Sequence, residues 1–362
     1  MKDAVVLIQR KKLVVRLSLG LLSVLTLAGC SWFSAEPSRV ENPVVRGVDY
    51  VGMTVSNLER SSVLYQKAAD LTPSDITQID SHPVVNSLVG RDGAKAKSRL
   101  LTSVNAQLKL TEFTQPAAKA ANTPHLEVYG PGIAHVCYQV AKHTHTYETF
   151  LANGATPIGD PEMIHLNPKN PVYYAYAHDP DHILFEVEHV DVQALELPTP
   201  PKNEYRIRHV SLATTDMDRS VDFYSHLLET KDPRRAGSLI KLSGEKLDKI
   251  AGQKDAAIEM AWFQIRNLEL EIIQYHSPQP TPLNTPRPFD ALGYNSVVFD
   301  VTDLAAAKAL LLEAGGTLVS DARPMDGGYI MYGRDLDGNL LGFQKSADGS
   351  PYSSQQFADN GI

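Results

Sequence analysis

Two histidines and two glutamates stand at matching positions of an internal repeat, where their side chains could bind one metal ion. Four stretches of the chain repeat one pattern. Only the second and third copies carry a His near the start and a Glu in the closing strand-like run: His135 with Glu186, and His209 with Glu271. Imidazole nitrogens and carboxylate oxygens suit a divalent ion such as Ni²⁺, Zn²⁺, Co²⁺, Mn²⁺ or Fe²⁺ and leave positions open for substrate oxygens. These four residues are the candidate metal ligands.

The repeat itself is supported by near-constant offsets along the chain. His209 of the third copy corresponds to Tyr50 of the first, an offset of 159 residues, and His135 corresponds to Ser296 of the fourth, an offset of 161. Such constant offsets indicate an internal duplication. The first and fourth copies lack plausible ligands, because their corresponding positions hold Tyr50, Lys109, Ser296 and Gly342.

Strand-like alternation predicts which side chains face the site. In residues 133–140, alternate side chains place His135 and Cys137 on one face, and in residues 207–213 they place His209 opposite the apolar residues. The apolar faces are expected to pack on helices, which leaves the histidines on a concave face. Cys137 is then an additional ligand, a reactive thiol or, as we favour, a small buried side chain.

Three motifs make the chain resemble the vicinal oxygen chelate superfamily, which includes glyoxalase I, extradiol dioxygenases, methylmalonyl-CoA epimerase and bleomycin-resistance proteins. They are the HV-x-L opening at 209–212, the S-x-x-F-Y helix at 220–224, and the D-P-D turn at 179–181 before the strand of Glu186. His182 stands where the turn usually has Gly. The resemblance implies an α+β fold of four tandem βαβββ modules that form two glyoxalase-like domains with incomplete barrels. Each module would supply one ligand from its first strand and one from its last.

The four modules could pair in two ways. If neighbours pair, each barrel holds one His and one Glu, and a homodimer could reunite these half-sites. If the second module faces the third, one cavity gains all four ligands, and the other holds the residues that have replaced them. Lys109 would repel a cation there. We favour the crossed arrangement, because it explains why the losses fall together.

The resemblance implies an isomerase, lyase or epimerase that acts on a small vicinal-oxygen compound through an enediolate-type intermediate. A ligating glutamate would move the proton, so Glu186 or Glu271 is the candidate general base, and the sequence does not decide between them. One alternative is a metal-poor protein that sequesters a ligand, as bleomycin-resistance proteins do. The other is an extradiol-type dioxygenase with Fe(II) held by two His and one carboxylate.

Two further histidines flank the turn that precedes Glu186. His178 and His182 could suggest a second metal site, but their place beside a hairpin favours solvated loop residues.

The first 29 residues resemble a bacterial lipoprotein signal peptide. Basic residues precede an apolar run at 17–27, which is too short to span a bilayer comfortably, and the segment ends before Cys30 in Leu-Ala-Gly-Cys. This resemblance predicts lipidation of Cys30. Because Ser31 follows rather than Asp, we expect a lipid-anchored protein of the bacterial cell envelope, on the periplasmic face of the outer membrane. An uncleaved anchor helix is the alternative.

The charge of the mature chain restricts its partners. Removing residues 1–29 takes five of the 34 basic residues and one of the 42 acidic residues, which leaves a net charge of −12. An acidic balance argues against nucleic acid and against electrostatic binding to anionic lipid. The expected partners are a small-molecule substrate, the membrane through the lipid alone, and, if the chain forms a homodimer, a second copy of itself.

Composition also divides the chain. After the signal peptide we expect a tether at 30–45, a first domain at 46–189, a linker at 190–206, a second domain at 207–345, and a disordered tail at 346–362.

Overall fold

The first two sequence repeats fold as two similar modules in the computed structural model, which describes residues 40, 42–195 and 203–361. Each module has a strand, a helix and strands that return beside the first strand. The first contains β1 (Val45–Thr54), α1 (Leu58–Ala69), β2 (Thr72–Pro73), β3 (Thr77–Asp80), α2 (Pro83–Val89), β4 (Lys95–Thr102) and β5 (Gln107–Phe113); after α3 (Ala118–Ala121), the second contains β6 (Gly132–Ala141), η1 (Lys142–Thr144), α4 (Thr146–Ala152), β7 (Thr156–Pro157), β8 (Ile164–His165), β9 (Val172–His178), β10 (Leu184–Val190) and η2 (Val192–Leu195).

The third and fourth repeats fold in the same way. The third contains β11 (Tyr205–Ala213), α5 (Met217–Leu227), β12 (Arg234–Ala236), β13 (Leu242–Ser243), α6 (Glu245–Ala251), β14 (Ala257–Ile265) and β15 (Leu268–Ser277); the fourth contains β16 (Gly293–Val301), α7 (Leu304–Glu313), β17 (Thr317–Met325), β18 (Gly328–Arg334), β19 (Leu340–Ser346) and η3 (Ser354–Gln356).

The helix that follows the first strand begins in the same way in three of the modules. The side chains of Asn57, Asp216 and Asp303 accept a hydrogen bond from the backbone amide three residues later at the start of α1, α5 and α7. Such N-caps satisfy an amide that has no partner within the helix. The cap therefore fixes where the chain turns from the strand into the helix that covers it.

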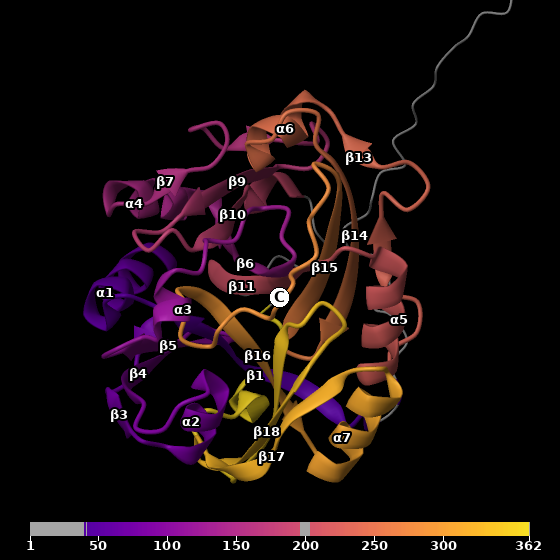
Figure 1. The fold of residues 1–362 in the computed structure, drawn as a ribbon. Helices are drawn as coiled ribbons and strands as arrows, with labels where there is room; N and C mark the ends of the chain where they lie inside the picture. The colour runs from indigo at the N-terminus through magenta and orange to yellow at the C-terminus, as the bar shows by residue number, and fades with distance from the viewer. Residues whose placement is uncertain (1–39, 41, 196–202, 362) are drawn as a thin grey trace, which may run out of the picture. The chain divides into compact units, whose positions relative to one another are not determined.

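The modules pair across the two halves of the sequence, which is the crossed arrangement (Figure 1). One sheet joins the first and fourth modules in the order β17-β18-β19-β16-β1-β5-β4-β2, with β3 on β4. The other joins the second and third in the order β12-β14-β15-β11-β6-β10-β9-β7, with β13 on β14 and β8 on β9. Both sheets are mixed, and neither closes into a barrel within the described residues. The predicted domains 46–189 and 207–345 therefore do not each form a sheet of their own.

Modules that are neighbours in sequence are held together by their helices. The α1 helix packs beside α4, and α5 beside α7. In the first half, Arg60 pairs with Asp181, and the Tyr65 hydroxyl donates to Asp179 at 3.0 Å, so α1 is tied to the turn between β9 and β10. The same contacts recur in the second half, Arg219 with Asp337 at 2.6 Å and Tyr224 with Asp335 at 2.7 Å.

The C-terminal segment corrects one prediction. The composition of residues 346–362 predicts disorder, but the structure describes them through residue 361, with Ser354 and Phe357 buried. The guanidinium of Arg266 donates to the Ser354 carbonyl at 2.9 Å and to the Phe357 carbonyl. A polar composition hides this docking, because one arginine from the body of the protein supplies the anchoring hydrogen bonds.

The predicted leader falls outside the described residues. This applies to the signal peptide 1–29, to Cys30, to most of the tether 30–45 and to residues 196–202 of the linker. Within the described chain, no helix combines the length and the apolar character needed to cross a membrane.

Candidate metal centre

The predicted ligands lie in two rows across the middle of the sheet formed by the second and third modules. Strands β10, β6, β11 and β15 are neighbours there, and their pairing places residues side by side. One row holds Glu186, Cys137 and His209, and the next holds His135, Ser211 and Glu271. The two rows are related by the sequence duplication, with Ser211 at the position of Cys137.

The four side chains meet at one point. The Nε2 atoms of His135 and His209 are 3.2 Å apart. Oε2 of Glu186 lies 3.3 Å from the first and 3.1 Å from the second, and Oε1 of Glu271 lies 3.7 Å from each. All four residues are buried, with exposed fractions of 1% for the histidines, 6% for Glu186 and 4% for Glu271.

This donor set fits a divalent metal ion. His135, His209 and Glu271 each offer one ligand atom within 4.8 Å of the others, and so do Cys137, Glu186 and His209. Two imidazoles with carboxylates are a ligand combination that borderline divalent metals accept. Carboxylates that converge in a buried site need a compensating positive charge, which the ion would supply. The buried triad is consistent with a divalent-metal site.

Electrostatics links the four groups even without an ion. Burial raises the pKa of Glu186, but the hydrogen bonds with His135 and His209 outweigh it and hold that pKa below its ordinary value. Burial lowers the pKa of His209, but Glu271 and Glu186 outweigh burial and raise it. For Cys137, burial and the neighbouring Glu186 both raise the pKa, so the thiol stays protonated as a small buried side chain.

The corresponding position of the other sheet is filled by an ion pair. Lys109 pairs with Asp326, and the Tyr50 hydroxyl donates to the same carboxylate at 2.7 Å. The Lys109 ammonium also lies 5.2 Å from the ring centres of Tyr50 and Tyr352. A cavity of about 10 Å³ remains beside Ser296, room for about one water molecule. This packing agrees with the loss of ligand residues from the first and fourth repeats.

A buried charged network beside the ligands is not indicated by the sequence. A β-bulge lies between Ile207 and His209, at Arg208. The Arg208 guanidinium pairs with Glu188 and, at 3.2 Å, with Glu269. Both acids lie two residues from a candidate ligand on the same strand, so they share its face. The sequence repeat does not reveal this bulge. The extra residue shifts the strand by one position, but polar and apolar residues still alternate before and after it.

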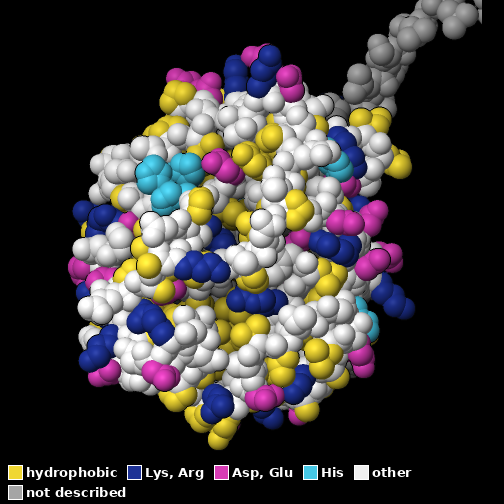
Figure 2. Space-filling model, viewed as in Figure 1, with side chains coloured by type: hydrophobic (Ala, Val, Ile, Leu, Met, Phe, Trp, Pro, Cys, Tyr) yellow, Lys and Arg dark blue, Asp and Glu magenta, His cyan; other side chains and the backbone are white. Residues whose placement is uncertain are grey.

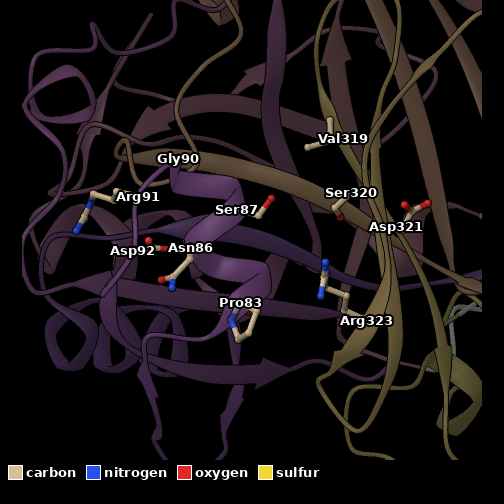
Figure 3. Close-up of a pocket in the computed structure, with 10 residues that line it drawn as sticks. All are labelled: Pro83, Asn86, Ser87, Gly90, Arg91, Asp92, Val319, Ser320, Asp321 and Arg323. Carbon is tan, nitrogen blue, oxygen red and sulfur yellow. The ribbon is translucent and has the colours of Figure 1, made fainter.

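A separate surface cavity of about 710 Å³ lies between α2 and β17 (Figure 3). Asn86 and Ser87 of α2 and Asp321 and Arg323 of β17 line it. It contains none of the candidate ligands. We assign the functional site to the buried cluster, because convergent titratable groups rather than cavity size mark a reactive centre.

Comparison with known proteins agrees with this fold. Residues 206–343 match the model of the Glyoxalase/Bleomycin resistance protein/Dioxygenase superfamily. Glyoxalase I from Zea mays is similar in structure, with 16% identity and a TM-score of 0.55, covering 83% of this chain and 92% of that chain. A putative dioxygenase from Bacillus subtilis subsp. subtilis str. 168 gives 10% identity and a TM-score of 0.54, covering 88% and 91%. No curated protein matches the sequence.

These matches agree with the observed fold. The α+β architecture with two mixed sheets resembles that of glyoxalase I. The match to the model of the Glyoxalase/Bleomycin resistance protein/Dioxygenase superfamily covers the third and fourth modules, and the structural likeness to glyoxalase I extends over most of the chain.

Proposed function

We propose that this protein is a divalent-metal-dependent isomerase, lyase or epimerase that acts on a small compound with neighbouring oxygen atoms. The observation that supports this proposal is the buried cluster in which the two imidazole nitrogens lie 3.2 Å apart and each lies 3.1–3.7 Å from an oxygen of both Glu186 and Glu271. His135, His209, Glu271 and Glu186 would hold the ion. Such an ion supplies positive charge that stabilises an enediolate, and so lowers the cost of removing a proton next to a carbonyl.

We assign the proton transfer to Glu186. The Ser211 hydroxyl donates to Oε1 of Glu271 at 2.8 Å and fixes that carboxylate. The matching position beside Glu186 holds Cys137, whose thiol is a weaker donor than a hydroxyl. Glu186 therefore lacks the hydroxyl bond that holds Glu271. Once it is released from the contacts with His135 and His209, its carboxylate would take a proton from the substrate carbon and return it.

Substrate access requires the residues over the cluster to move. The ring of Tyr176 lies 5.1 Å from that of His135, and Tyr275 from β15 contacts Tyr129 at 6.4 Å between ring centres. Tyr129 belongs to the segment between α3 and β6. A cavity of about 640 Å³ lies between residues 118–130 of that segment and residues 283–288. Its volume suits a small molecule, so we infer that substrate approaches from this side.

Proton exchange tests the proposal even while the reaction product is unidentified. The metal-loaded full-length protein is incubated in D₂O with a panel of small 2-hydroxy and 2-oxo carbonyl compounds, and loss of the carbon-bound proton signal is followed by NMR. We expect exchange with at least one compound, and its loss in Glu186→Gln. Failure of the protein to bind a divalent metal, or metal binding without exchange in any compound, would favour sequestration over catalysis.

An extradiol-type dioxygenase is a second candidate, because the crossed sheet brings two histidines and one carboxylate into one site. His135, His209 and Glu271 match the ligand types of the facial triad of Fe(II) oxygenases. Metal content separates the two proposals. Tightly bound iron with oxygen uptake on a catechol would support the dioxygenase, whereas nickel, zinc or cobalt would support the isomerase or lyase.

We also propose that Cys30 is lipidated and anchors the protein in the cell envelope, with the metal centre outside the cytoplasm. The support is the lipoprotein-like leader sequence. Incorporation of a labelled fatty acid into the wild-type protein, and its loss in Cys30→Ala, is the expected outcome. Equal labelling of both proteins would contradict the assignment.

A further inference from the structure

A second group of histidines lies on the surface, away from the buried centre. His178 ends β9, His182 lies in the turn to β10, and His125 comes from the segment between α3 and β6. The ring centres of His125 and His182 are 5.1 Å apart, and those of His178 and His182 are 5.6 Å apart. Figure 2 shows histidine side chains gathered in one patch over the region of β9 and β10. The fold thus adds a third imidazole to the two that flank the turn in the sequence.

These ring separations allow the imidazoles to share one ion once their nitrogens turn toward a common point. Two histidines bound to one tetrahedral metal at about 2.0–2.1 Å hold their ring centres roughly 5 Å apart. The buried pair, His135 and His209, has ring centres 5.4 Å apart. The two ring separations in the surface group, 5.1 Å and 5.6 Å, lie just below and just above this value. His125 and His182 are exposed, so small rotations of their side chains can aim the nitrogens at a common point.

The backbone at His182 adopts a conformation that glycine reaches most easily. Its φ is +57°, in the left-handed region that glycine adopts without steric cost. The duplicated turn of the fourth module has Gly338 at the matching position, with φ +86°. A bulky side chain has thus been placed where the backbone favours glycine, next to two other imidazoles. Strained positions of this kind are retained at binding sites more often than elsewhere.

We propose that His125, His178 and His182 form a second binding site for a borderline divalent transition metal, such as Ni²⁺, Zn²⁺ or Cu²⁺, at the protein surface. Three neutral nitrogens would bind the ion, and water would complete the coordination. The turn fixes part of this site, since the amide of His182 donates to the Asp179 carbonyl at 2.9 Å and His178 is paired with Leu184 in the β9–β10 ladder.

The charges around the group favour uncharged imidazoles. Burial lowers the pKa of His178, and the neighbouring His182 and His125 lower it further. Burial, His182 and Arg287 lower the pKa of His125, while Asp181 opposes them. Asp181 is itself engaged by Ser56 and Arg60, so it adds little negative charge to the group. Neutral imidazole is the form that binds metal.

Nickel binding to the full-length protein, without an added histidine tag, tests the site. The background is the double variant His135→Ala/His209→Ala, which removes the buried centre. We expect about one Ni²⁺ per chain in this background, measured by equilibrium dialysis and by paramagnetic broadening of histidine NMR signals. His182→Gly restores the residue type of the duplicated turn and should fold well. It should weaken nickel binding about tenfold or more, because losing a ligand costs at least as much as losing a group that only orients one.

A matched control is His143→Ala, because His143 is exposed but pairs with Glu204 away from the group. We expect its nickel affinity to equal that of the background. Unchanged affinity in His182→Gly, or no nickel binding in the background, would overturn the proposal. If the double variant does not fold, the wild type and His182→Gly are compared directly, and the weaker of the two nickel-binding steps should weaken by the same factor. Identical nickel titrations of the two proteins would then decide against the site.

Discussion

Lys109 and Asp326 form a buried ion pair at the position in one sheet that corresponds to the candidate metal centre of the other. Lys109 matches Glu271 in the duplication, and Tyr50, which matches His209, donates to the same Asp326 carboxylate. An ammonium built into the chain thus takes the place of a bound cation. This sheet keeps a positive charge at its centre without needing a metal.

Removal of the lysine should destabilise the protein strongly. In Lys109→Met, the Asp326 carboxylate is left buried without its partner, which costs about 3–5 kcal/mol. In Lys109→Met/Asp326→Asn, much of that loss should be recovered, because no uncompensated charge remains. Urea unfolding of the two variants and the wild type measures the difference. An equal loss in both variants would show that packing, not charge, accounts for the effect.

Metal content should depend on the second and third modules alone. We expect about one divalent ion per chain at the buried site after dialysis, and loss of that equivalent in His135→Ala, because the ion loses one of its two imidazoles. The matched control is Ser296→Ala, which alters the equivalent residue of the other sheet. Elemental analysis of the three proteins is the measurement. Loss of metal in the control would contradict the assignment of the ligands.

Replacing Glu186 and replacing Glu271 should have different effects, the first chiefly on proton exchange and the second chiefly on metal content. Glu186→Gln should reduce proton exchange by about 10²–10⁴-fold, the usual contribution of a general base, with a smaller effect on metal content. Glu271→Gln removes the carboxylate that Ser211 holds in place and should chiefly lower metal content. NMR exchange and metal analysis on the same samples distinguish these outcomes. The opposite pattern would make Glu271 the base.

Stability should fall as the pH rises through the titration of Asp179. Burial raises the pKa of this carboxyl to about 6, from an ordinary value of 3.8. The folded state therefore binds the proton more tightly than the unfolded chain, and its advantage is lost as pH increases from about 4 to 6. The loss is on the order of 3 kcal/mol. Asp179→Asn should reduce this pH dependence.

Urea unfolding at pH 4.5 and pH 7 measures how much the free energy of unfolding changes with pH in the wild type and in Asp179→Asn. Asp222→Asn serves as the control, because Asp222 is exposed on α5. Asp335 also has a raised pKa through burial, so some dependence should remain in Asp179→Asn. Identical pH dependence in the wild type and Asp179→Asn would show that Asp179 does not contribute.

The duplication made the convergence of the four candidate ligands and the crossed pairing predictable. His135 and His209 could be matched to Ser296 and Tyr50 by offset alone, and the clustered losses indicated which modules share a cavity. The contacts between Arg60 and Asp181 explain why arginine is shared at matching positions of the first and third copies, since each ties a helix to the next module.

Other features were beyond the sequence for physical reasons. Asp326 lies in the turn between β17 and β18, where nothing marks it as the partner of Lys109, 217 residues away. His125 lies in an irregular segment whose path is set by tertiary packing. The bulge at Arg208 changes which face a residue occupies without changing the pattern. The tail is ordered by Arg266, a residue far from it in sequence.

Because the modules pair across the two halves of the chain, metal affinity would also depend on how completely the chain has folded. Each half of the chain supplies one histidine and one glutamate, so under the proposed function all four would hold an ion only when the halves have joined. A ligand that binds only the assembled state stabilises it by mass action. Metal affinity then measures how completely the protein has folded, and a substitution at a distant contact such as Arg60 would weaken binding without touching a ligand. A cell that limits the metal would thereby also limit the lifetime of the folded chain.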